Sequence, residues 1–141
     1  KFVDVKLEVG GGYTGIEGGY KNPSHLAPGY TIAINPVTSK IAWKQPLEEF
    51  AISAGTLATD GGLLFTGKLT GEFIALDQDT GKKVWQFKTG SSVNAPPITF
   101  THKGKQYVAV LSGRGGSNAG RFVTNSVPAG GAVWLFTLKD D

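Results

Sequence analysis

The stretch that decides the fold is residues 71–87, GEFIALDQDTGKKVWQF. Its first half alternates around Phe73 and Ala75, and its second half carries Trp85 and Phe87. The intervening DQDTG offers side-chain oxygens that accept bonds from nearby backbone, followed by a glycine that can take positive φ. The stretch therefore predicts two antiparallel strands joined by a tight turn. A single hairpin is marginal in water, so the prediction gains weight only if neighbours pack on it.

The sequence pattern of this hairpin occurs twice in the chain. GYTIAINPVTSKIAW, residues 29–43, stands forty-two residues earlier and matches residues 71–85 in the pattern G-x-x-x-A-x-[ND]-x-x-T-x-x-x-x-W. A period of about 40–45 residues built from short strands is typical of a β-propeller blade, which must stack on neighbours to bury its faces. Chance use of one turn sequence is the alternative, and five matched anchors at one offset argue against it.

The repeated anchors predict specific contacts. We expect the Asx residue and the threonine of each copy to close the turn by local hydrogen bonds. We expect the small alanine, Ala75 in the second copy, to seat an indole from a neighbouring segment. Ala75 and Trp85 would then form part of a girdle that locks one blade to the next.

Composition favours an all-β chain and excludes several classes of function. The 141 residues include 21 glycines, 40% of the residues are apolar, and the net charge is +3 with scattered lysines. No run of like charge indicates nucleic acid, and no apolar run is long enough to span a membrane. The chain has no cysteine, so it can form neither a disulfide framework nor a thiolate metal site. No signal peptide is recognisable at Lys1, which leaves the compartment open.

The length conflicts with a closed propeller. Propellers close with about four to eight blades, whereas only about three periods fit here. An unclosed propeller exposes blade faces and strand edges, so we expect other polypeptide to complete the ring, and residues 1–141 alone to be insoluble or oligomeric. The chain would be a proteolytic fragment or a separate subunit. A stand-alone small β domain is the weaker alternative.

The predicted organisation is a partial propeller in four segments. Residues 1–28 form a glycine-rich segment and loop, 29–46 the outer half of one blade, 52–89 a complete blade, and 96–138 a last, incomplete blade. The nine predicted strands after the entry segment are 31–34, 41–44, 56–59, 63–67, 72–76, 84–87, 98–101, 106–111 and 132–138, and the weak alternation of residues 1–7 allows one more. No fourth strand follows in the last blade, which would then borrow a strand from elsewhere in the whole protein.

Common enzyme motifs are missing from the sequence. It contains no Ser-His-Asp constellation, no metal-spaced cluster and no strand–glycine loop–helix unit for a nucleotide. The stretch GRGGSNAG, residues 113–120, lacks the Lys-Ser/Thr ending of a phosphate loop.

One family is closely similar. Residues 54–113, AGTLATDGGLLFTGKLTGEFIALDQDTGKKVWQFKTGSSVNAPPITFTHKGKQYVAVLSG, resemble the C-terminal blades of alcohol dehydrogenases that depend on pyrroloquinoline quinone (PQQ), nearest to the methanol and soluble ethanol dehydrogenases. The repeated A-x-[ND]-x-x-T-x-x-x-x-W resembles the tryptophan-docking motif of that family. The resemblance runs from about Gly29 to the tail GAVWLFTL, and the first 28 residues match poorly.

The resemblance implies an eight-bladed propeller with PQQ lying flat near its axis and a Ca²⁺ or lanthanide ion beside it. An Asp would act as general base on the alcohol while hydride passes to the quinone. The resemblance places that base and the metal ligands in earlier blades, outside this chain, so no catalytic or metal-binding residue is assigned here. It further implies a periplasmic enzyme with a cytochrome c as electron acceptor.

Two places should face the cofactor by this resemblance. One contains Ser53 and Ala54, and the other is the run Arg114, Gly115, Gly116 and Ser117. Glycine permits close backbone approach, and Arg114 could pair a carboxylate. Arg114 as a solvated loop residue and Ser53 as a packed strand residue are the alternatives.

The sequence also departs from the methanol dehydrogenases, which carry Trp at the positions of Ser53 and Ser117. Smaller residues at both places indicate a wider substrate chamber and an alcohol larger than methanol. The sequence therefore predicts part of a periplasmic quinoprotein alcohol dehydrogenase, which closes the propeller and lines part of the cofactor chamber. The alternative is a cofactor-free propeller that acts as a protein-binding scaffold in the bacterial envelope.

Overall fold

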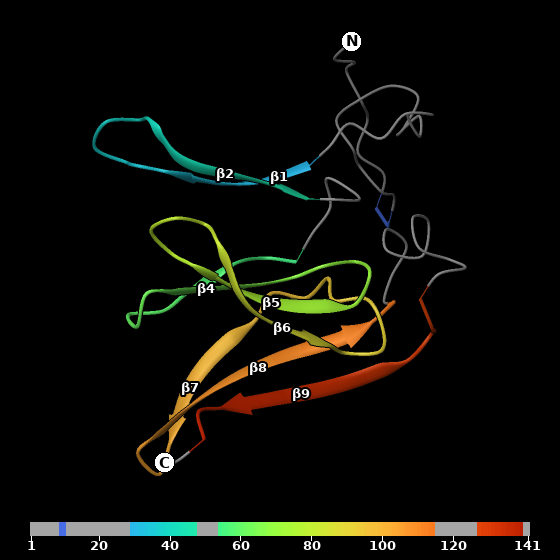
Figure 1. The fold of residues 1–141 in the computed structure, drawn as a ribbon. Coiled ribbons are helices and arrows are strands. Elements are labelled where there is room, and N and C mark those ends of the chain that lie inside the picture. The colour runs from blue at the N-terminus through green and yellow to red at the C-terminus, as the bar shows by residue number, and fades with distance from the viewer. Residues whose placement is uncertain (1–8, 11–28, 48–53, 115–126, 140–141) are drawn as a thin grey trace.

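The computed structural model describes residues 9–10, 29–47, 54–114 and 127–139, and within them nine strands form three antiparallel sheets. The strands are β1 (Gly29–Ile34), β2 (Ile41–Leu47), β3 (Leu57–Ala58), β4 (Leu63–Gly67), β5 (Glu72–Asp77), β6 (Lys83–Lys88), β7 (Ile98–His102), β8 (Lys105–Gly113) and β9 (Gly131–Thr137). The first sheet is the two-stranded hairpin β1-β2, the second sheet has the order β3-β4-β5-β6, and the third has the order β7-β8-β9. The three sheets lie one above another, with the four-stranded sheet in the middle (Figure 1).

The strands agree well with the sequence prediction. Each of the nine predicted strands has a counterpart among the described residues. The largest differences are at β3, which has only two residues where four were predicted, and at β2, which continues three residues further to Leu47; β8 also continues two residues further to Gly113. The segment bounds predicted for the blades stay a prediction, and residues 1–8 and 11–28 lie outside the described residues.

The two repeated turns are closed as the sequence predicted. In the first turn the Asn35 carboxamide oxygen accepts hydrogen bonds from the backbone nitrogens of Val37 and Thr38 at 2.9 and 3.1 Å. In the second, the Asp77 carboxylate accepts from the backbone nitrogen and hydroxyl of Thr80 at 2.8 and 2.7 Å. These bonds stabilise the charged form and hold the pKa of Asp77 below its usual 3.8, with the hydroxyl of Thr80 as the largest cause.

Strand β5 of the middle sheet is buried on both faces, because the neighbouring sheets cover both sides. On one face Phe73 packs in a cluster with residues of the third sheet, Val108 and Val110. On the other face Ile74 and Leu76 pack against Trp43 of the first hairpin. Alternating side chains of β5 therefore serve two different interfaces, as a period of two requires.

Trp43 joins the first hairpin to the middle sheet through the second turn. Its indole nitrogen donates to the backbone oxygen of Gln78 at 2.8 Å. A Cβ at Gly81 would lie 2.6 Å from the indole carbons Cδ2 and Cε3 of Trp43. Gly81 also has a φ of 70°, so both the backbone and the indole require glycine here.

This contact corrects the predicted role of the alanine. Ala75 lies opposite Trp85, its cross-strand partner on β6 within the same sheet. The indole of the neighbouring sheet instead sits against Gly81. A side-chain carbon at the turn would block that approach, whereas the alanine leaves room on its own sheet for Trp85.

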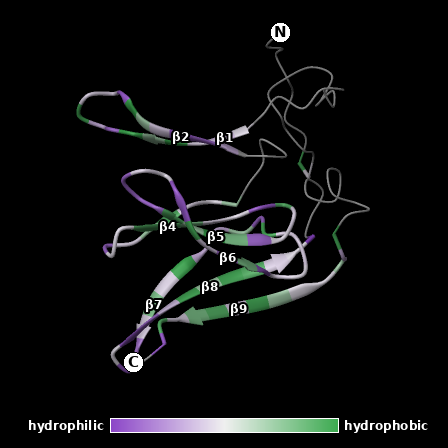
Figure 2. Ribbon diagram, viewed as in Figure 1, coloured by the Kyte–Doolittle hydropathy of each residue, from purple (hydrophilic) through white to green (hydrophobic). Residues whose placement is uncertain are grey.

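Apolar side chains are exposed on the outer faces of the two outer sheets. On β1 the exposed side chains are Tyr30, Ile32 and Ile34, and on the third sheet they are Ile98, Phe100, Leu111, Val133 and Leu135. Figure 2 shows the apolar stretches along β8 and β9. Apolar faces of this extent mark surfaces that another layer covers, as expected of blades within a longer stack.

Candidate functional site

The first predicted cofactor segment is held on the middle sheet. The backbone nitrogen of Ala54 donates to the Gly67 oxygen at 3.4 Å, and the Thr66 hydroxyl lies 3.4 and 3.3 Å from the backbone oxygens of Ala54 and Gly55. Ala54 is buried, and a Cβ at Gly55 would lie 2.8 Å from Cβ of Pro96. These bonds fix the backbone of the segment on the middle sheet, and the Ala54 side chain packs inward.

The second predicted segment begins where β8 ends. Gly113 pairs with Gly131 of β9, and its nitrogen donates to the backbone oxygen of Ser92 at 2.7 Å. A Cβ at Gly113 would lie 2.9 Å from the Gly130 oxygen, so glycine allows the strands to approach closely here. Arg114 follows directly and is half-buried.

The structure brings these two segments to the same end of the stacked sheets. Val93 packs where a Cβ of Gly67 would lie, beside the residue that holds Ala54. Ser92, the residue before Val93, accepts the bond from Gly113. The links from Ala54 through Gly67, Val93 and Ser92 to Gly113 thus connect the two predicted cofactor segments.

The described part of this region suits an anionic, planar ligand. Ala54, Gly55, Gly113 and Arg114 together carry one positive charge and no carboxylate. Backbone amides beside glycines allow close approach, and a guanidinium binds carboxylates with two parallel bonds. A guanidinium here is chemically compatible with a carboxylate-bearing ligand, and the contact of Arg114 with a cofactor stays a prediction.

Four of the six predicted site residues lie outside the described residues. They are Ser53, Gly115, Gly116 and Ser117. Their predicted contacts with the cofactor, and the wider chamber inferred from the two serines, stay predictions. Ala54 and Arg114 are the two predicted residues that the structure places.

Metal ligands and membrane spans were also sought in the described ranges. No three His, Cys, Asp or Glu side chains in these ranges lie close enough together to hold a metal ion. Within the same ranges, no helix has the length and apolar character needed to cross a membrane.

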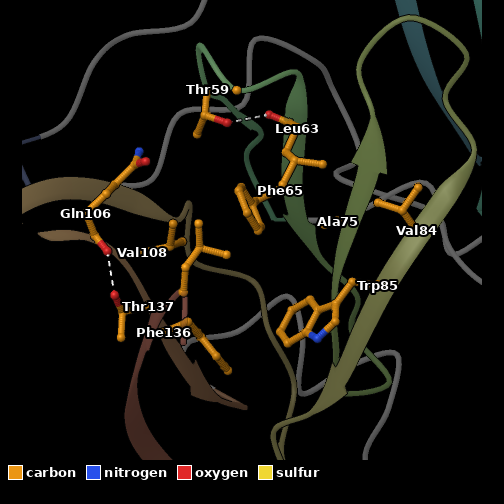
Figure 3. A pocket seen from close by; sticks show the side chains of 12 residues that line it. Thr59, Leu63, Phe65, Ala75, Val84, Trp85, Gln106, Val108, Phe136 and Thr137 are labelled. Atoms are coloured by element: carbon orange, nitrogen blue, oxygen red, sulfur yellow. Dashed lines mark hydrogen bonds between the residues drawn. The ribbon is translucent and has the colours of Figure 1, made fainter. Parts of the chain in front are cut away.

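A pocket of about 410 Å³ lies at the other end of the strands, between the middle and third sheets. It is lined by Thr59, Gly61, Leu63, Phe65, Ala75, Val84, Trp85, Gln106, Val108, Phe136, Thr137 and Leu138 (Figure 3). Gln106 lies near the start of β8 and Thr137 at the end of β9, whereas Gly113 and Gly131 mark the opposite ends of these strands. None of the described predicted site residues lines this pocket, so it is separate from the cofactor region.

Sequence reasoning missed the serines that connect the two sheets. It assigned Ser91 and Ser92 no role. The available signal was the run of small polar residues TGSS, residues 89–92, between two strands. Such residues often bond neighbouring backbone, but their partners here are distant in sequence.

Comparisons with known proteins define the class. The family model described as "Glucose/ethanol/alcohol dehydrogenase, beta-propeller domain" of the PQQ proteins matches residues 21–108. The chain therefore belongs to the β-propeller family of PQQ dehydrogenases. This membership confirms the fold class predicted from the repeat, an all-β partial propeller.

Individual relatives agree with this assignment. The chain is 36% identical to quinoprotein alcohol dehydrogenase PedE of Pseudomonas putida, over 96% of this chain and 22% of the relative. It is 44% identical to methanol dehydrogenase [cytochrome c] subunit 1 of Methylobacterium organophilum, over 82% of this chain and 17% of the relative. The solved structure of a europium-containing methanol dehydrogenase matches with a TM-score of 0.64 and 31% identity, over 76% of this chain and 23% of that one. The chain thus spans about a fifth of the length of these relatives.

Proposed function

We propose that this chain is part of a periplasmic quinoprotein dehydrogenase that oxidises alcohols larger than methanol, with hydride transfer to PQQ. The chain closes the propeller and lines part of the cofactor chamber. The observation that carries the proposal is the meeting of the Ala54 and Gly113–Arg114 segments at one end of the sheets, in a chain of the PQQ dehydrogenase family.

Each described residue has a limited role in this proposal. PQQ, when bound, supplies the hydride acceptor. Arg114 binds one of its carboxylates, and the backbone around Gly55 and Gly113 approaches the flat ring system closely. The remaining polypeptide supplies the Asp base and the ligands of a Ca²⁺ or lanthanide ion, and a cytochrome c accepts the electrons.

The substrate class follows from Ser53 and Ser117. A serine occupies far less volume than the tryptophan found at the corresponding positions of the methanol dehydrogenases. Removal of two large side chains from a chamber wall leaves room for a longer alkyl group. We therefore expect activity to rise from methanol to a primary alcohol of several carbons.

Closure of the propeller is supported by the third sheet. In the middle sheet β6 pairs with β5, whereas in the third sheet no described strand pairs with the outer edge of β9. Trp85 is 39% exposed in the pocket beside this edge, whereas Trp43 is 9% exposed in its dock. A strand from the remaining polypeptide added to β9 completes a four-stranded blade and brings a turn over Trp85.

The test uses the complete protein, purified without quinone. PQQ is titrated in the presence of Ca²⁺ or a lanthanide, and dye-linked oxidation is measured for an alcohol series that starts at methanol. We expect quinone uptake, activity that peaks beyond methanol, and weaker quinone binding in Arg114→Ala. Lys88→Ala is the matched control, because it removes one exposed positive charge from β6.

Three results would overturn parts of the proposal. Failure of the complete protein to take up PQQ with any metal refutes the proposed dehydrogenase activity and favours the cofactor-free propeller that binds other proteins. A preference for methanol refutes the wider chamber alone. Recovery of the complete protein from the cytoplasm after cell fractionation refutes the periplasmic location.

A further inference from the structure

We propose that Ser91 is a positioning residue that fixes the Arg114 segment relative to the preceding blade. The inference rests on the proposed function, because Arg114 is there the charged contact of the cofactor. Ser91 itself touches neither quinone nor substrate in this proposal. It acts through the backbone of the segment that carries Arg114.

The turn that carries Ser91 is built firmly on the middle sheet. The Thr89 hydroxyl donates to the backbone oxygens of Gly71 and Ser91, at 3.0 and 2.7 Å. The Ser92 hydroxyl donates to the Leu69 oxygen at 2.6 Å, and the Val93 nitrogen donates to the Lys68 oxygen at 3.0 Å. The turn therefore moves with the β4–β5 connection as one unit.

From this base the turn reaches both ends of the next loop. The Ser92 backbone oxygen accepts from the Gly113 nitrogen at 2.7 Å, just before Arg114. The Ser91 hydroxyl donates to the Pro128 oxygen at 2.7 Å, at the far end of the same connection between β8 and β9. Two adjacent serines thus hold the two ends of one connection that lies in another blade.

Both serines are buried, and burial protects their hydrogen bonds from competition by water. Ser91 is 3% exposed and Ser92 is 0% exposed, so water cannot readily replace either bond. A neutral hydrogen bond in such surroundings contributes modestly to stability but defines a distance well. The buried Ser112 hydroxyl, which accepts from the Trp134 indole at 3.1 Å, holds the β8 side of the connection to β9. The Ser91 hydroxyl ties the β9 side of the connection, at Pro128, to the preceding sheet.

The chain offers a matched control one residue away. Ser91→Ala removes the bond to Pro128, which crosses between the sheets. Ser92→Ala removes an equally buried serine bond whose partner, Leu69, belongs to the same sheet as the turn, and it leaves the backbone oxygen that binds Gly113. Only the first substitution releases the connection that carries Arg114.

The experiment uses the complete protein and two readouts. Hydrogen exchange without quinone, in peptides that contain Gly113, Arg114 and Pro128, should accelerate in Ser91→Ala and stay unchanged in Ser92→Ala. PQQ titration followed by the absorption spectrum of the bound quinone should give a dissociation constant raised about three- to tenfold in Ser91→Ala only. Ser91→Thr, which keeps the hydroxyl, should restore wild-type binding.

A double-mutant cycle tests whether Ser91 acts through Arg114. In the Arg114→Ala background, the added Ser91→Ala should weaken quinone binding by less than twofold, because the positioned group is gone. Full additivity of the two effects refutes the inference. Equal exchange in Ser91→Ala and wild type also refutes it, even if quinone binds normally. Faster exchange in Ser91→Ala without quinone binding in any variant refutes the proposed function and retains only the structural link.

Discussion

The two interfaces of the middle sheet use the same residue type in different ways. On one side Trp43 is 9% exposed, rests on Gly81 and donates to Gln78. On the other side Trp85 is 39% exposed and contacts the Phe136 ring at a centroid distance of 5.3 Å. One indole is docked on a turn, and the other lines a pocket.

The difference shows that a docking tryptophan needs a turn from the next blade. Trp43 meets the turn between β5 and β6. The matching place for Trp85 follows β9, where the described residues end at Lys139. The aromatic cluster of Phe73, Trp85 and Phe136 buries the inner part of the second interface, and its outer part stays exposed. Each copy of the repeat therefore needs the turn of the next blade to seat its tryptophan.

The largest expected effect comes from breaking the formed dock with Gly81→Ala in the complete protein. The methyl group would overlap the Trp43 indole, and the backbone would hold a side chain at a φ of 70°. We expect a loss of about 2–4 kcal/mol in stability, measured by thermal unfolding. Gly62→Ala is the control, because its φ is 77° but nothing lies near its Cβ, so it should lose only about 1–2 kcal/mol. Equal losses would contradict the packing argument.

A second prediction sharpens the comparison between the two indoles. Trp43→Phe removes the bond to Gln78 and part of the dock, so it should cost about 1–3 kcal/mol. If the remaining polypeptide covers Trp85 as proposed, Trp85→Phe in the complete protein should cost a similar amount. Thermal melts of both variants provide the test. A cost for Trp85→Phe below half of that for Trp43→Phe would argue against closure over Trp85.

A smaller effect is expected where the two turns differ in backbone. Ser39 has a φ of 55° at the position where the second turn has Gly81. Ser39→Gly should relieve this left-handed strain and raise stability by about 0.5–1 kcal/mol, after the entropy cost of glycine. A rise in the melting temperature of the complete protein checks this. Lys40→Gly, at an exposed neighbour in the same turn whose φ is not positive, serves as the control, and a lowered melting temperature for Ser39→Gly would refute the strain.

The smallest effect concerns pH and the Asx residues of the two turns. The pKa of Asp77 is lowered by its bonds to Thr80, so the charged form stabilises the fold above the unfolded pKa near 3.8. This contribution disappears as pH falls through the lower pKa of the folded protein. Asp77→Asn, which copies Asn35 of the first turn, should leave melting at neutral pH nearly unchanged and flatten its acid dependence. An unchanged slope below pH 4 in melts of the variant would contradict this assignment.

The fold was largely predictable because its elements are local. Alternation around Phe73 and the Asp77–Gly81 turn indicate a hairpin without reference to any distant residue. The forty-two-residue period then predicts stacking. The alanine was misassigned because alanine and glycine are both small, and only the packed sheets show which of them meets the neighbouring indole.

The candidate site was predictable only in part. Its glycines and Arg114 stand out in the sequence because close approach and anion binding favour those residue types. Ser91 did not stand out, because its partner Pro128 is thirty-seven residues away and belongs to another sheet. The sequence pattern of one segment does not indicate a hydrogen bond to a distant segment.

By itself the sequence determined the strands, the turns and the blade repeat, since these depend on side-chain alternation and on local hydrogen bonds. It also led to the expectation that other polypeptide completes the ring, because propellers close with about four to eight blades. The tertiary structure decided which residues make the contacts between sheets. Gly81 seats Trp43, and Ser91 binds the backbone oxygen of Pro128. These contacts depend on how separate sheets approach one another, and that approach is set by the packing of all their side chains together.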